Sequence, residues 1–218
     1  MVITYYGLAA CKVQYSSTVL AFSPVSKKSS YRASTFGADL ALIAVNHPDY
    51  NGRDQVAFGS KEPFVIDGPG EYEVNGIYVR GFGVLQKKPK EEGGTMRVNT
   101  IYSVLFEGVN LCHLGCLDSK ELAPEVTESL GEIDVLFLPI FKNTLDDSVA
   151  SKLANTLNPK IVVPLYDDHD TGEKSLSQFL KESGRGGLKP EDRLTLRKKD
   201  LEGKVREVVL LEPNGKTA

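Results

Sequence analysis

The chain has few cysteines and no long apolar run, and each shortage excludes a class of protein. Its three cysteines, Cys11, Cys112 and Cys116, are an odd number without a disulfide framework, which is typical of a reducing compartment. No apolar run approaches the roughly 20 residues of a transmembrane helix, so we expect no membrane association. The N-terminus lacks a charged region followed by a long apolar one, so we expect no signal peptide. The predicted location is the cytoplasm.

Excess charge is also lacking. The formal net charge is -3, which provides no electrostatic footprint for nucleic acid or an anionic membrane, so we expect neither as a partner. Hydrophobic residues make up 41% and charged residues 25% of the 218 residues, an ordinary globular composition. A chain of this length can bury a sizeable core.

The first half of the chain is rich in strand signals. Short runs of β-branched and aromatic residues alternate with turn residues, and Asn75-Gly76 is a strong signal for a tight hairpin turn. Residues 86–97 form a charged segment without periodicity, which favours a solvated hairpin tip over a substrate lid. The expected strands are 2–6, 10–15, 18–23, 39–45, 55–58, 64–66, 99–106 and 109–113.

The second half alternates between helix and strand signals. Ser119 is a candidate N-cap for the first helix and Thr144 for the second, whose apolar residues recur at helical spacing. The charged stretch 191–205 is interpreted as part of a solvated hairpin between two closing strands. The expected helices are 119–130, 144–157 and 175–182, and the expected strands are 133–138, 161–163, 193–197 and 205–212.

This order of elements predicts two sheets sandwiched between helices. Such a chain has an α+β fold, a four-layer αββα sandwich, rather than a doubly wound sheet. No linker or internal repeat interrupts the sequence, so we expect a single domain spanning residues 1–218.

One stretch, DLALIAVNHPDYNG at 39–52, combines a buried-strand run with a polar turn that carries His47 and Asp49. Metal sites are commonly built in this way, with a rigid strand that positions a loop bearing imidazole and carboxylate groups. The order resembles the H-x-H-x-D-H signature of the metallo-β-lactamase superfamily. In this alignment Val45 stands at the first His, His47 at the second, Asp49 at the Asp and Tyr50 at the last His.

Further stretches resemble the same superfamily in order, and most closely its small bacterial branch of zinc-dependent hydrolases near the ascorbate-6-phosphate lactonase type. The block FVIDGPGEYEVNGIYVRG at 64–81 is the most characteristic and is intact. Four other stretches carry replacements at functional positions. These are TVLAFSP with Ser23 in place of Asp, LCHLGC with Cys116 in place of the bridging Asp, IDVLFLPI followed by Phe141 in place of Gly, and NPKIVVPLYD with Tyr166 in place of the last His.

The resemblance implies two metals that share a bridging carboxylate and activate a hydroxide. The first metal would be held by Val45, His47 and His113, of which Val45 has no donor atom. Phenols are poor zinc ligands near neutral pH, since an unperturbed tyrosine pKa is about 10. A thiolate is a good zinc ligand, and some β-lactamases of the superfamily use a Cys in the corresponding role. The second metal would be held by Asp49, Tyr50, Cys116 and Tyr166.

Two interpretations of these residues remain open. In the first, Ser23, Val45, Tyr50 and Tyr166 mark degenerate ligand positions of a catalytically impaired protein, which has no metal and is retained for binding or assembly. In the second, His47, Asp49, His113 and Cys116 hold a single zinc ion and Asp49 is the catalytic residue of a divergent hydrolase of a small ester, lactone or phosphoester. His169 is a candidate replacement for the lost final His. We favour the first.

Other functional assignments are weaker. His113 and Cys116 lack the third group that a Cys–His nucleophile requires, and Cys112 alternates to the opposite face of its strand, where we expect it in the core. Gly68-Pro69-Gly70 is interpreted as a framework turn, because no helix start or Lys-Ser/Thr pair follows it. A small-molecule ligand and a homo-oligomer are both compatible with the sequence.

Overall fold

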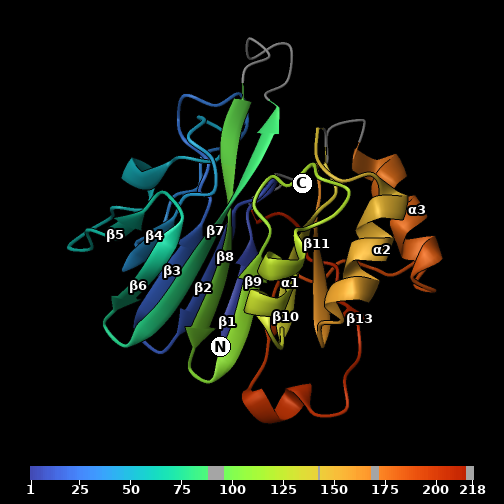
Figure 1. The fold of residues 1–218 in the computed structure, drawn as a ribbon. Coiled ribbons are helices and arrows are strands. Elements are labelled where there is room, and N and C mark those ends of the chain that lie inside the picture. The colour runs from blue at the N-terminus through green and yellow to red at the C-terminus, as the bar shows by residue number, and fades with distance from the viewer. Residues whose placement is uncertain (88–95, 142, 168–171, 215–218) are drawn as a thin grey trace.

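The computed structural model describes residues 1–87, 96–141, 143–167 and 172–214, and its strands form two sheets that face each other (Figure 1). The first sheet has six strands and contains both antiparallel hairpins of the N-terminus and two parallel strands that follow them. In spatial order its strands are β12 (Leu194–Thr195), β1 (Val2–Tyr5), β2 (Cys11–Tyr15), β3 (Thr18–Phe22), β4 (Leu40–Leu42) and β5 (Phe64–Ile66).

The second sheet has seven strands. Its first-half strands pair antiparallel, whereas the strands of the second half run parallel to one another. In spatial order they are β13 (Glu207–Val208), β11 (Ile161–Leu165), β10 (Val135–Pro139), β9 (Val109–His113), β8 (Met96–Phe106), β7 (Ile77–Lys87) and β6 (Gly70–Val74). The Asn75-Gly76 turn joins β6 and β7, with both residues at positive φ, as predicted.

The core lies between the two sheets and beneath the helices. On β3, Leu20 and Phe22 point into this main core, whereas Val19 and Ala21 point to the outer face, where Val56 covers them. Strands β10 and β11 are buried along their whole length, because helices cover the face that is turned away from the first sheet. The helices α1 (Pro124–Leu130), α2 (Asp147–Leu157) and α3 (Gly172–Glu182) gather on this side (Figure 1).

The arrangement confirms the predicted α+β fold with two large sheets. It also places the β7–β8 hairpin so that its far end extends beyond the neighbouring strands (Figure 1). The strands of this hairpin reach to Lys87 and begin again at Met96, so part of the expected charged loop at 86–97 is sheet, and 88–95 lie outside the described residues. None of the described helices is long and apolar enough to cross a membrane.

Three predictions of local structure were wrong. Residues 55–58 do not form a strand, because the chain turns through a 3-10 helix at Arg53–Gln55 after Gly52 packs against the Val25 backbone. The first helix begins at Pro124, since the Ser119 hydroxyl donates to the Glu121 carbonyl instead of capping a helix.

The third wrong prediction concerns the N-cap of α2. The cap is Asp146, whose Oδ1 accepts the Val149 N–H at 2.8 Å, whereas the Thr144 hydroxyl bonds to the Phe141 backbone.

The closing hairpin is also absent. β12 pairs with β1 in the first sheet and β13 pairs with β11 in the second, so the two strands belong to different sheets. The intervening residues include the 3-10 helix Lys198–Leu201, which buries Leu201. The tail therefore ties the two sheets together.

Candidate functional site

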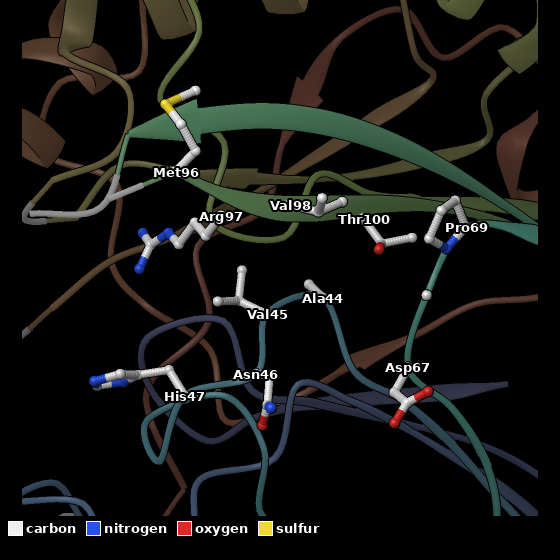
Figure 2. A pocket seen from close by; sticks show the side chains of 11 residues that line it. Ala44, Val45, Asn46, His47, Asp67, Pro69, Met96, Arg97, Val98 and Thr100 are labelled. Carbon is white, nitrogen blue, oxygen red and sulfur yellow. The ribbon is translucent and has the colours of Figure 1, made fainter. Parts of the chain in front are cut away.

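A cavity of about 660 Å³ opens where β4 and β5 end, and the start of β8 forms its opposite wall (Figure 2). The loop after β4, predicted to carry function, thus meets the turn after β5, predicted to be a framework turn. The lining residues are Ala44, Val45, Asn46, His47, Asp67, Gly68, Pro69, Met96, Arg97, Val98 and Thr100.

The loop after β4 is held in place by hydrogen bonds that cross between the two sheets. The Thr100 N–H of β8 donates to the Ala44 carbonyl at 2.9 Å, and the buried Tyr102 hydroxyl donates to the Ile43 carbonyl at 2.8 Å. The Ala44 N–H in turn donates to the Ser23 hydroxyl, at 3.3 Å. Ser23 therefore stabilises the backbone of the loop at Ala44.

His47 and Asp49 stand together on this loop. His47 lines the cavity, and its Nδ1 lies 3.5 Å from Asp49 Oδ2 and accepts the Asp49 backbone N–H at 3.2 Å. The other carboxylate oxygen, Asp49 Oδ1, accepts the Ser29 hydroxyl at 2.5 Å. Asp49 thus joins His47, through its backbone N–H, to the preceding loop, through its carboxylate.

His113 is fully buried at the end of β9. Its Nε2 lies 2.9 Å from the Ala9 carbonyl and its Nδ1 accepts the Gly115 N–H at 3.0 Å, so the neutral ring carries its proton on Nε2. The ring stacks on Phe22 with centroids 5.0 Å apart. Burial lowers the pKa of His113 to about 4, against the bond to Ala9, which raises it.

Cys116 is fully buried, and the turn that precedes it is held by the side-chain amide of Asn99. Asn99 Oδ1 accepts the Cys116 N–H at 2.7 Å, and Asn99 Nδ2 donates to the Leu114 carbonyl at 3.0 Å. Gln86 Nε2 donates to the Cys116 carbonyl at 2.9 Å. Gly115 has a φ of +65°, and a Cβ there would lie 2.3 Å from Asn99 Oδ1.

Aromatic side chains occupy two of the metal-ligand positions that the resemblance implies, those of Tyr50 and Tyr166, and Phe141 stands where it implies a glycine. Tyr50 and Phe141 are buried with ring centroids 6.2 Å apart, and burial raises the pKa of Tyr50, as do the neighbouring Cys116 and Asp49. Tyr166 packs on Tyr5, with centroids 5.4 Å apart, and its hydroxyl donates to the Leu211 carbonyl. The Tyr50 phenol is therefore held in its neutral form.

The donor set in this arrangement does not fit the two-metal centre that the fold family implies. Val45 has no donor atom, both ring nitrogens of His113 bond to the backbone, and the phenol of Tyr50 would have to ionise in a buried place. Within the described part of the chain, no group of three or more His, Cys, Asp or Glu side chains is placed to hold a metal ion. His169 lies outside the described residues, and the predicted single-metal site stays a prediction.

Sequence reasoning missed the residues that β8 contributes to the cavity wall. Met96 and Arg97 were placed in a charged loop and Val98 in no element, although apolar and polar residues alternate over 96–99 with the period of a strand. Joining this short alternation to the strand signals of 99–106 would have found them. Arg97 is the cationic group among these wall residues.

Comparisons with known proteins agree with the fold. The family model of the beta-lactamase superfamily domain matches residues 2–166. A structure from Thermotoga maritima, assigned as a Zn-dependent hydrolase of the metallo-β-lactamase superfamily, is 26% identical with a TM-score of 0.71, over 96% of this chain and 97% of that one. A second, from Parabacteroides distasonis and assigned as a metal-dependent hydrolase, is 20% identical with a TM-score of 0.64, over 96% and 93%.

More distant structures share the fold alone. The metallo hydrolase Igni18 from Ignicoccus hospitalis is 17% identical with a TM-score of 0.61, over 90% of this chain and 99% of that one. No curated protein matches the sequence. Because the family model spans most of the chain and the fold agrees, this chain belongs to the metallo-β-lactamase superfamily.

Proposed function

We propose that this protein is a superfamily member that has given up the hydrolytic metal centre and uses the retained cavity for binding. The hydrogen bonding of His113 carries the proposal. A histidine binds a metal through the lone pair of a ring nitrogen, and here that lone pair, on Nδ1, accepts the Gly115 N–H while Nε2 donates to Ala9. Coordination would require His113 to break a buried hydrogen bond.

The surroundings of Cys116 support the same proposal. The Tyr50 hydroxyl is hydrogen-bonded to the Cys116 side chain, and the Tyr50 ring is packed between His47 and Phe141. Where the family places a histidine ligand, this chain therefore has a buried phenol. The Asp49 carboxylate accepts the Ser29 hydroxyl, a contact that stabilises the loop.

One observation favours the alternative, a single-metal hydrolase of a small ester, lactone or phosphoester. His47 lines the cavity, and its Nδ1 lies only 3.5 Å from Asp49 Oδ2, as two ligands of one ion would. Completing that site would need His113 to turn away from Ala9 or Gly115 and Cys116 to ionise.

Zinc titration of the ¹⁵N-histidine-labelled protein, followed by NMR of the ring nitrogens, tests the proposal. We expect the His113 signals to remain those of the neutral Nε2–H ring at equimolar zinc. We also expect no zinc-dependent turnover of p-nitrophenyl acetate, γ-butyrolactone or p-nitrophenyl phosphate. A shift of the His113 signals at equimolar zinc, together with turnover that His113→Ala abolishes, would establish the alternative instead.

A cytoplasmic location remains part of the proposal. All three cysteines are buried and none forms a disulfide, which suits a reducing compartment. Self-association stays a prediction from the resemblance.

A further inference from the structure

The cavity has two chemically different ends. Figure 2 shows the Arg97 guanidinium and the His47 ring at one end and the Asp67 carboxylate at the other, with Val45 and Val98 between them. Asp67 Oδ2 lies 3.5 Å from Arg53 Nη1, so a cation outside the lining offsets this carboxylate. The cavity therefore has a cationic end at Arg97, an apolar middle, and an opposite end whose carboxylate is paired with Arg53.

Arg97 brings its charge close to the positions at which the family binds metal. Burial raises the pKa values of Tyr50 and Asp118, and in each case the positive charge of Arg97 opposes this effect. The side chain is half-buried on β8, in register with Gln86 of β7. A guanidinium has five N–H donors in a planar fork, so it can bond to neighbouring groups and still bind a carboxylate or phosphate.

An apolar wall adjoins this cation. Met96 and Val98 are 49% and 46% exposed, and both line the cavity with Pro69. Pro69 packs closely on the hairpin because position 83 is a glycine, where a Cβ would lie 3.3 Å from Pro69 Cγ and 3.4 Å from Val98 Cγ1. Apolar side chains that gather at the wall of a cavity are typical of ligand sites.

We propose that the cavity binds a small organic anion with an apolar chain. Arg97 holds the head group through its guanidinium, and the chain lies along Pro69, Met96 and Val98. The volume of about 660 Å³ falls in the range of roughly 300–1,000 Å³ that is usual for small-molecule sites. This inference rests on the proposed function, because a metal at His47 and Cys116 would itself attract the anion.

The test is calorimetric titration of the full chain with three probes that share one alkyl chain: hexanoate, hexyl phosphate and 1-hexanol. The metal content of the same sample is measured alongside. We expect at least one of the two anions to bind about tenfold more tightly than the alcohol, since bonds to a charged group contribute about 1.5–3 kcal/mol. The tighter anion identifies the head group as carboxylate or phosphate.

Matched variants assign the binding to the cavity. Arg97→Gln should weaken anion binding about tenfold or more and leave 1-hexanol unchanged, whereas Arg80→Gln, a half-buried arginine on β7 outside the cavity, should change neither. Val98→Asn should weaken all three probes, and Leu105→Asn, at an exposed position of the same strand, should weaken none. Amide NMR shifts should map to the loop after β4 and to β8.

Equal binding of anion and alcohol, no binding of any probe, or an unchanged Kd in folded Arg97→Gln protein would overturn the proposal. The proposed function can fail separately. If the sample contains one metal ion per chain but anion binding still depends on Arg97 after the metal is removed, the function is wrong and this inference stands. If binding disappears with the metal and Arg97→Gln has no effect, both are wrong.

Discussion

Gly115 is the residue on which the turn before Cys116 depends. Its φ of +65° is unfavourable for a side-chain-bearing residue, and a Cβ would lie 2.3 Å from Asn99 Oδ1 and 2.7 Å from Ala44 Cβ. Asn99 has little freedom to move away, because its amide bonds to Leu114 and Cys116. The glycine therefore allows the turn to lie directly against the cavity loop.

We expect Gly115→Ala to lower the free energy of unfolding by about 2 kcal/mol or more, through backbone strain and the clash together. Gly108→Ala is the matched control, because its φ is +72° and no atom beyond its chain neighbours lies within 4 Å of the added Cβ. It should cost about 1 kcal/mol from strain alone. Urea denaturation of both variants measures the difference, and equal losses would contradict the role of the contact.

His113 makes stability depend on pH. Its pKa is lowered by burial to about 4, whereas an unfolded histidine titrates near 6.5, so between these values the unfolded chain binds a proton that the folded chain does not. Stability contributed by the neutral ring is complete above pH 6.5 and is lost as pH falls towards 4.

The expected loss from this residue is about 3 kcal/mol between pH 7 and pH 4. His113→Gln cannot titrate, so its unfolding free energy should fall less steeply over this range, even if it is lower at pH 7. Urea denaturation at several pH values compares the slopes. Parallel curves for the two proteins would show that His113 is not buried in its neutral form.

At the scale of elements, a buried carboxylate joins strands of the second sheet to the 3-10 helix of the tail. Asp134, just before β10, accepts the Asn110 N–H, Lys160 Nζ and Lys198 Nζ at 2.8, 2.8 and 2.6 Å. Burial would raise its pKa, but these hydrogen bonds outweigh burial and hold the pKa below its ordinary value. The contribution of the ionised Asp134 to the free energy of unfolding is therefore present above about pH 4 and is lost as pH falls through the lowered pKa.

Asp134→Asn should lower the free energy of unfolding by about 2 kcal/mol at pH 7, because it removes a buried negative charge and leaves Lys160 and Lys198 without their anionic partner. Glu132→Gln is the control, since Glu132 also pairs with Lys160 but its side chain is 69% exposed. It should change stability by less than about 0.5 kcal/mol. Thermal and urea denaturation measure both, and similar effects would contradict the importance of the buried carboxylate.

Much of the element order could be predicted, because strand periodicity and turn residues such as Asn75-Gly76 act over short distances. The closing strands could not be placed, since β12 and β13 pair with β1 and β11, which are distant in sequence. In the candidate site, too, local features could be predicted and contacts between distant residues could not. Sequence placed His47 and Asp49 on one loop, but the hydrogen bonds of His113 depend on Ala9, which no local pattern connects to it.

At the scale of the whole molecule, the superfamily framework is present, and the proposed loss of the metal centre leaves the cavity in place. The bonds that hold the cavity loop, from Thr100 and Tyr102 to the backbone at 43 and 44, use no metal ligand. The fold can therefore keep an open cavity without a metal to organise it. That the whole chain is one domain stays a prediction.

Elemental analysis of protein purified without a metal-affinity tag tests the central claim most directly. Zinc, manganese and iron are counted per chain, before and after incubation with zinc and desalting, for the natural chain and a His47→Ala, His113→Ala double variant. We predict far less than one metal ion per chain in every sample. A value near one in the natural chain that the double variant loses would contradict the account and establish a metal centre at these residues.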